Sequence, residues 1–143
     1  MTGYAGDVTP QHVWEQLASR PDAYLVDVRT RAEWAFVGIT DLSSIGQAPL
    51  LIEWQSFPDM MVSESFQGTL DAALKEQGAE KDAQIFMMCR SGARSRSAAQ
   101  AMTAMGYSNC FNIATGFEGD LNEDGKRGVL GGWKAEGLPW RQS

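Results

Sequence analysis

The sequence is poor in the two residue types that most often build disulfide frameworks and metal sites. It has two cysteines, Cys89 and Cys110, and one histidine, His12, in 143 residues. Two cysteines are too few for a disulfide scaffold, and their spacing does not form a Cys-x-x-Cys pair. A single histidine excludes a histidine-rich metal site and leaves little scope for a Cys–His couple. We therefore expect neither a metal ion nor a cofactor.

Long apolar runs and excess positive charge are also missing. No segment approaches the roughly 18 apolar residues that a membrane-spanning helix needs. The first residues, MTGYAGDVTPQ, lack the basic start and apolar core of a signal peptide. The formal net charge is -6, which argues against nucleic acid or an anionic membrane surface as a partner. These absences predict a cytoplasmic protein that binds neither nucleic acid nor membrane.

The sequence does contain a regular alternation of apolar runs and helical periodicity. A length of 143 residues fits one domain, which we place at residues 1–143. The expected strands are 23–28, 83–88 and 107–113, and the expected helices are 8–21, 30–36, 66–78 and 95–106. Such alternation predicts an α/β fold with a mainly parallel central sheet and helices on both faces.

Three other stretches give weaker patterns. Residues 38–66 mix apolar pieces with Gly, Pro and Ser, which predicts a loop-rich passage with one strand near 50–53. The segment GGWKAEGLPW predicts a short helix around 133–136 and then a turn. The segment DLNEDG, 120–125, has the acidic spacing of a calcium loop, but its twelfth position is Gly131 instead of glutamate. We interpret it as a solvated turn.

The segment CRSGARS, residues 89–95, offers a nucleophile in a cationic loop. It connects an expected strand to an expected helix, so its backbone N–H groups can form an anion cradle. These amides, the helix dipole, Arg90 and Arg94 would stabilise the thiolate of Cys89 without a histidine. Between Asp82 and Glu118 the sequence has no acidic residue. The pattern predicts a small anionic substrate.

Each cysteine also has a structural interpretation. A cysteine after an apolar run is usually a buried and inert core residue. For Cys89 the glycine loop, the arginines and the following helix favour a functional role. Cys110 lies mid-strand between Asn109 and Phe111, and we interpret it as a core residue, with a resolving thiol as the alternative.

Four motifs in order along the chain are similar to those of one family. They are YLVDVRTRAEW, CRSGARS, GYSNCFNIATGFEG and GWKAEGLPW. With them the chain resembles the rhodanese-like sulfurtransferases, in particular their single-domain members. The resemblance departs at residues 37–42, where the family commonly has Gly-His-Ile-Pro-Gly-Ala and only Ile39 matches.

The resemblance implies a mechanism and a set of site residues. Cys89 would take the outer sulfur of a small anionic donor such as thiosulfate, become a persulfide, and pass the sulfur to cyanide, a thiol or a protein acceptor. Arg90 and Arg94 would attract the donor. The residues whose amides would hold the thiolate and the persulfide are Arg90, Ser91, Gly92, Ala93, Arg94 and Ser95. The residues that would orient the loop, or form a purely structural ion-pair network, are Asp27, Arg29 and Glu33.

Other functions remain open at this point. A persulfide carrier or receiver that acts on a partner protein would use the same Cys89 chemistry. Related cysteine phosphatases and arsenate reductases have five residues between cysteine and arginine, whereas four separate Cys89 from Arg94, so the shorter loop favours sulfur. We expect a monomer or a weak dimer. In the long segment 43–66, Trp54, Phe57 and Met60 are candidates for pocket lining or for core packing.

Overall fold

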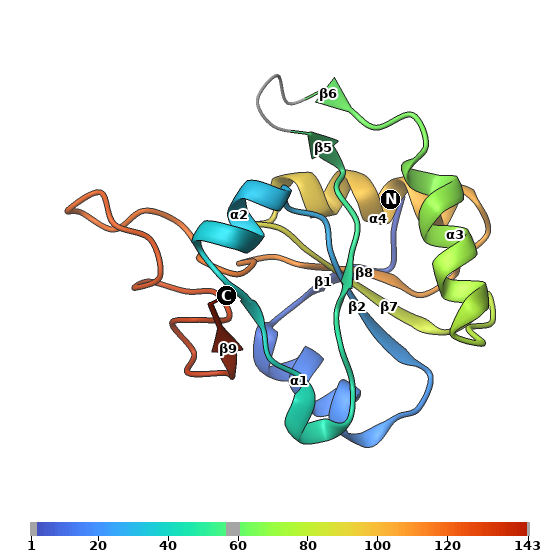
Figure 1. Cartoon of the computed structure of the whole chain (residues 1–143), viewed down its shortest axis with the longest axis horizontal. Helices are drawn as coiled ribbons and strands as arrows, with labels where there is room; N and C mark the ends of the chain where they lie inside the picture. Colours follow the sequence, from blue (N-terminus) through green and yellow to red (C-terminus); the bar gives the residue numbers. More distant parts are fainter. Residues whose placement is uncertain (1–2, 57–60, 143) are drawn as a thin grey trace.

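A five-stranded sheet forms the centre of the molecule (Figure 1). The computed structural model describes residues 3–56 and 61–142. The strand order is β1-β8-β7-β2-β4, and every neighbouring pair is parallel. The strands are β1 Gly6–Val8, β2 Ala23–Asp27, β4 Leu50–Leu51, β7 Gln84–Met88 and β8 Cys110–Ile113. The mainly parallel α/β fold expected from the sequence is confirmed.

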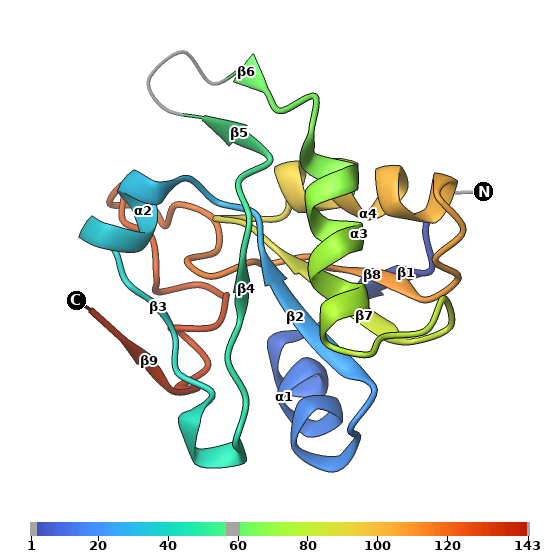
Figure 2. The same ribbon diagram turned by 45° about the vertical axis from the view of Figure 1, so that its right-hand side comes forward.

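Helices cover both faces of this sheet (Figure 2). Helix α1, Pro10–Ser19, packs on one face, and α3, Phe66–Glu76, and α4, Ala93–Ala104, pack on the other. Two core clusters result, one on each side. None of the helices within residues 3–56 and 61–142 is long and apolar enough to cross a membrane.

Strand β7 divides its side chains between the two cores. Phe86 and Met88 lie in the cluster on the α1 side, whereas Ile85, Met87 and Cys89 lie in the cluster with α3 and α4. This follows from the period of two along a strand. The alternation turns the thiol of Cys89 toward the first residues of α4.

The helix starts follow the capping chemistry of the sequence. The Thr9 side chain accepts a hydrogen bond from the His12 amide, and Pro10 occupies the first helical position of α1. Helix α2, Arg31–Phe36, begins with a full capping box between Thr30 and Glu33. Glu33 of this capping box also reaches the cysteine loop, where it pairs with Arg94.

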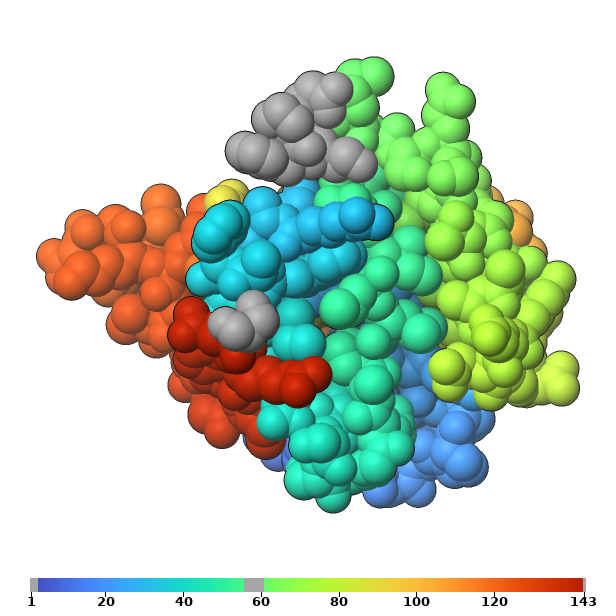
Figure 3. Space-filling model, in the orientation of Figure 1, coloured from blue at the N-terminus to red at the C-terminus, as the bar shows by residue number. Residues whose placement is uncertain are grey.

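The remaining elements are short. Residues 43–45 form a 3₁₀ turn, η1 Ser43–Ile45. Two antiparallel pairs lie outside the central sheet: β3 Ile39–Thr40 pairs with β9 Trp140–Arg141, and β5 Gln55–Ser56 pairs with β6 Met61–Val62. The loop-rich character of residues 38–56 and 61–66 and the strand near residue 50 are confirmed. The orange segment that follows β8 projects from the body beside α2 (Figures 1 and 3).

Three details differ from the sequence-based expectation. Strand β1 was not expected, because Gly6–Val8 has no apolar run. Helix α4 begins at Ala93 instead of Ser95, because Gly92 adopts φ 109° and serves as its N-cap. The expected helix around 133–136 is wrong: residues 133–137 form a turn, which ends where Gly137 adopts φ 75°.

Candidate active site

Cys89 lies at the carboxyl end of β7, where ligands bind in sheets of this type. Its side chain is buried, with 1% of its surface exposed. It lines a cavity of about 320 Å³. The other lining residues come from α2, β5, the loop that follows β7 and the start of α4: Glu33, Gln55, Arg90, Ser91, Ala93 and Arg94.

The loop from Cys89 to Ser95 curls around the sulfur. The Gly92 amide donates a hydrogen bond to Cys89 Sγ at 3.1 Å. A side chain at position 92 would be strained by the positive φ and would collide with the Ala114 carbonyl oxygen. Glycine is therefore needed for the amide to face the sulfur. A thiolate there gains both this N–H and the positive end of α4.

Ser95 provides the second polar contact of the sulfur. Its Oγ lies 3.2 Å from Cys89 Sγ and 2.5 Å from Oδ1 of Asn112. One hydroxyl carries one proton, so Ser95 donates to one of these partners at a time. The hydroxyl can donate to Asn112 while a Cys89 thiol donates to its oxygen, or it can donate to a Cys89 thiolate.

Asn112 and Asp7 extend this contact into a polar chain that the sequence did not indicate, and it runs from the buried Ser95 and Asn112 to the exposed Asp7. Asn112 Nδ2 donates to Asp7 Oδ1 at 3.0 Å, and the Tyr4 hydroxyl donates to the same oxygen at 2.8 Å. The first bond turns the Asn112 carbonyl toward Ser95. The sequence signal that could have identified Asn112 is the two-residue period of β8. Asn112 lies on the same face of this strand as Cys110 and therefore points at α4.

Arg94 and Glu33 form a bidentate ion pair across the cavity. The two guanidinium–carboxylate distances are 2.6 and 3.0 Å, and both side chains are less than one-fifth exposed. Burial acts to raise the pKa of Glu33, but the hydrogen bonds and charge of Arg94 outweigh it and hold that pKa below its ordinary value. Burial acts to lower the pKa of Arg94, and Glu33 raises it overall. The pair stays charged throughout the neutral range.

Asp27 and Arg29 form a second ion pair that is fully buried behind the loop. Arg29 Nη2 lies 2.7 Å from Asp27 Oδ2 and also donates to the Gly38 carbonyl at 2.7 Å. The guanidinium stacks on the Phe117 ring, with 4.2 Å between its central carbon and the ring centre. The Phe117 amide in turn donates to the carbonyl of Cys89 at 2.8 Å. Asp27 and Arg29 thus support the loop through Phe117.

Arg90 fixes the loop with its backbone and leaves its side chain exposed. Its carbonyl accepts from the amides of Glu118 and Gly119 at 3.0 and 3.1 Å. Gly116 must be glycine here, since a side chain would collide with the carbonyls of Cys89 and Arg90. The structure therefore brings together all ten residues that the sequence assigned to the site.

Cys110 is not placed to react with Cys89. It lies opposite Ile85 in the sheet register, four residues before Cys89, which corresponds to about 13 Å along the strand. A disulfide needs Cα atoms within about 7 Å. Burial also raises the pKa of the Cys110 thiol to about 12. Cys110 is a core residue, as expected, and not a resolving thiol.

The candidates in the two long segments have structural roles where they are described. Trp54 packs edge-on against Phe66, with 4.9 Å between ring centres, which supports core packing. Phe57 and Met60 lie outside the described residues. Asn122 accepts from the amides of Asp124 and Lys126, as a solvated turn requires. Residues 3–56 and 61–142 hold no acidic, histidine or cysteine cluster suited to a metal ion.

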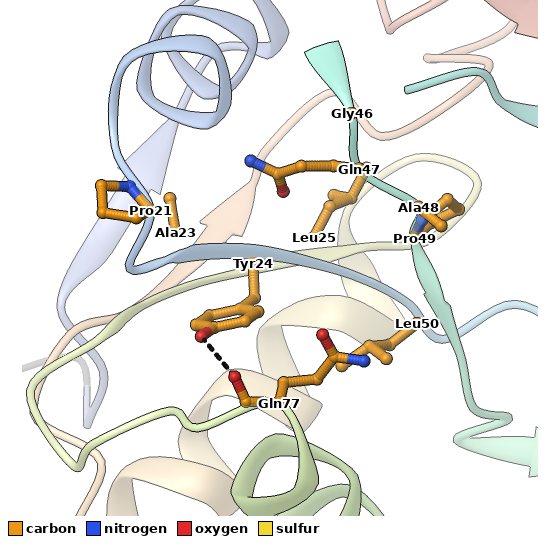
Figure 4. Close-up of a pocket in the computed structure, with 10 residues that line it drawn as sticks. All are labelled: Pro21, Ala23, Tyr24, Leu25, Gly46, Gln47, Ala48, Pro49, Leu50 and Gln77. Carbon is orange, nitrogen blue, oxygen red and sulfur yellow. Dashed lines mark hydrogen bonds between the residues drawn. The ribbon is translucent and has the colours of Figure 1, made fainter. Parts of the chain in front are cut away.

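A larger cavity, of about 680 Å³, lies near the other end of β2 (Figure 4). It opens where β2 and the segment before β4 diverge, and the Tyr24 hydroxyl crosses it to the Gln77 carbonyl at 3.4 Å. Its lining residues are Pro21, Ala23, Tyr24, Leu25, Gly46, Gln47, Ala48, Pro49, Leu50 and Gln77. None of these is charged or a strong nucleophile, so the chemistry belongs to the smaller cavity.

Comparison with known proteins agrees with this geometry. The rhodanese-like domain family matches residues 9–123. The uncharacterized RP600 homolog of Rickettsia rickettsii is 40% identical over 128 residues, which cover 90% of each chain. The crystal structure of Rv0390 from M. tuberculosis has a TM-score of 0.85 and 44% identity, covering 98% of this chain and 99% of that one.

A more distant structure shares the fold. It is the polysulfide-sulfur transferase homodimer from Wolinella succinogenes, with a TM-score of 0.57 and 21% identity. The match covers 96% of this chain and 78% of that one.

Proposed function

This chain belongs to the rhodanese-like domain family, and on that premise we propose that it is a sulfurtransferase that carries sulfane sulfur on Cys89. The donor is a small sulfur compound such as thiosulfate, and the acceptor is a nucleophile such as cyanide or a thiol. One observation carries the proposal: Cys89 Sγ lines an open cavity and accepts the Gly92 amide at 3.1 Å.

Two displacements at sulfur would complete the reaction. The Cys89 thiolate attacks the outer sulfur of thiosulfate, the S–S bond of the donor breaks, and sulfite leaves with the bonding electron pair. Cys89 then carries a persulfide anion. Cyanide attacks the outer persulfide sulfur, thiocyanate leaves, and the thiolate returns. The Gly92 N–H and the Ser95 hydroxyl stabilise the negative sulfur in both states.

The loop supports sulfur transfer over phosphate chemistry. A phosphatase of the related type would need arginine at the position of Ser95, so that a guanidinium fork could hold the phosphate. Here Ser95 places a small hydroxyl against Cys89, and Arg94, which lines the same cavity, is bound to Glu33. Both cysteines are free, which supports a reducing, cytoplasmic setting for a persulfide that is passed to thiols.

The test is sulfur transfer to cyanide. The protein is incubated with thiosulfate, then cyanide is added and thiocyanate is measured. We expect turnover by the wild type and by Cys110→Ala, the matched cysteine control, and none by Cys89→Ala. Hydrolysis of a phosphate ester without thiocyanate formation would overturn the proposal. A persulfide that forms on Cys89 and turns over slowly with cyanide would instead favour a carrier that serves a partner protein.

A further inference from the structure

The cation beside the nucleophile is already neutralised by the protein. Arg94 gives both of its terminal nitrogens to Glu33, at 2.6 and 3.0 Å. Glu33 is held in return by Thr30, whose amide and hydroxyl both donate to its Oε1 at 3.2 Å. The carboxylate therefore has four donors and a fixed place at the wall of the cavity.

The charges around Cys89 balance. The charged side chains that line the cavity are Arg90, Arg94 and Glu33, and with the Cys89 thiolate their formal charges sum to zero. The second ion pair behind the loop, Asp27–Arg29, adds no net charge. The site therefore does not compensate the charge of a donor that enters it. The chain around the site has a formal net charge of -6.

Resting on the proposed function, we propose that Glu33 determines donor specificity and selects singly charged persulfides over doubly charged thiosulfate. Thiolate attack on a persulfide anion, R–S–S⁻, forms the Cys89–sulfur bond, breaks the S–S bond of the donor and releases R–S⁻. The same step with thiosulfate releases sulfite with two charges. The thiosulfate complex thus carries one more uncompensated negative charge throughout the step, and Glu33 repels it.

Glu33 keeps its negative charge, and with it the repulsion of thiosulfate, at neutral and mildly acidic pH. Arg94 outweighs the effect of burial and lowers the pKa of Glu33, so the carboxylate stays ionised at neutral and mildly acidic pH. Glu33 contacts neither the sulfur nor any reacting atom, so it acts on specificity through charge and through the position of Arg94.

The experiment compares two donors in Glu33→Gln. Glutamine keeps the shape and can still accept from Thr30 and Arg94, but it removes one negative charge. The measured quantity is the second-order rate constant of Cys89 persulfidation, followed by mass, with thiosulfate and with the singly charged persulfide of β-mercaptoethanol. We expect the ratio of thiosulfate to persulfide rates to rise about tenfold in Glu33→Gln.

Asp22→Asn is the matched control, because it also neutralises a carboxylate paired with arginine, at the other end of β2. We expect its donor ratio to equal that of the wild type. An unchanged ratio in Glu33→Gln, with both donors active, would overturn the inference and leave the proposed function intact. If Cys89 takes sulfur from neither donor, the proposed function itself fails.

A measurement on the wild type covers the case in which Glu33→Gln does not fold. Added salt screens the repulsion that the dianion experiences from Glu33 and from the net charge of -6 on the chain. We expect the thiosulfate rate to rise with ionic strength, and to rise more than the persulfide rate. A thiosulfate rate that falls with increasing ionic strength would mean that net positive charge at the site attracts the donor, and would contradict the inference.

Discussion

The two cysteines share one core cluster and differ in their surroundings. Cys89 faces a cavity and accepts an amide hydrogen bond, whereas burial raises the pKa of Cys110 to about 12. We expect iodoacetamide at neutral pH to alkylate Cys89 at least about a hundredfold faster than Cys110. Peptide mass spectrometry of a time course measures both rates. Equal rates would mean that the loop does not activate the thiol.

Asn112 is the residue whose removal should reveal the polar chain behind Ser95. In Asn112→Ala, the buried Ser95 hydroxyl loses its partner, which should cost about 1–3 kcal/mol of unfolding free energy in urea, whereas the exposed Asp7 can bind water instead. Persulfidation of Cys89 should slow as well, because the Ser95 hydroxyl loses its fixed orientation.

Asn109→Ala provides the control for this effect. Asn109 lies on the same segment, but its side-chain amide donates to the Asp82 carbonyl at an exposed position. The Asn109→Ala variant should leave the rate of Cys89 persulfidation unchanged. If the two variants slow persulfidation equally, Asn112 does not position Ser95.

Residue-level prediction of the geometry succeeded where the contacts are local in the sequence. The segment from Cys89 to Ser95 carries its own glycine, arginines and helix start, so the arrangement of this loop around Cys89 could be predicted, and its role stays a proposal. Asn112 and Asp7 could not be found in this way, because they reach Ser95 only through the pairing of β1, β8 and β7. The pairing of Arg94 with Glu33, 61 residues apart, could not be predicted from the sequence either. This pairing changes the role that we infer for Arg94 from donor attraction to charge balance.

At the scale of elements, long periodic segments were predictable and short ones were not. Strands β2, β7 and β8 and helices α1 and α3 have apolar runs or a regular apolar face. Strand β1 has three residues, among them Gly6 and Asp7, and depends on β8 for its hydrogen bonds. The segment 133–137 has helix-forming residues but too few of them before Gly137 and Pro139 to sustain more than one turn.

Asp71 joins α3 to the segment that follows α4, and this link should depend on pH. Its carboxylate accepts from Tyr107 at 2.6 Å and pairs with Lys75 at 3.0 Å. These partners lower the pKa of Asp71 to about 2. The folded-state pKa is depressed, so the link stabilises the fold above about pH 4, the unfolded value, and is lost as pH falls toward 2.

Acid unfolding of Asp71→Asn tests this link. The variant should be less stable than the wild type at pH 7, and the difference should shrink between about pH 4 and pH 2. Chemical denaturation at a series of pH values measures it. A stability difference that stays constant down to pH 2 would contradict the assigned role of the carboxylate.

On the scale of the whole molecule, the fold places the buried Cys89 at the carboxyl end of β7, the central strand of the sheet, between two cores. Strand β7 alternates its side chains so that Cys89 faces α4, and the ion pairs of β2 and α2 support the loop from the other side. The chain is acidic overall, yet the formal charges of Arg90, Arg94, Glu33 and a Cys89 thiolate sum to zero in the Cys89 cavity. The family and the general α/β class could be predicted from the sequence, while this charge balance required the tertiary contacts.

The central claim is that sulfur is carried on Cys89. The most direct measurement exposes the wild-type protein briefly to a sulfur donor, blocks free thiols, and locates the added sulfur by peptide mass spectrometry. We expect one added sulfur atom on the peptide that contains Cys89, removable by cyanide, and an unmodified Cys110 peptide. Added sulfur on Cys110, or on neither cysteine with both thiosulfate and a persulfide as donors, would contradict it.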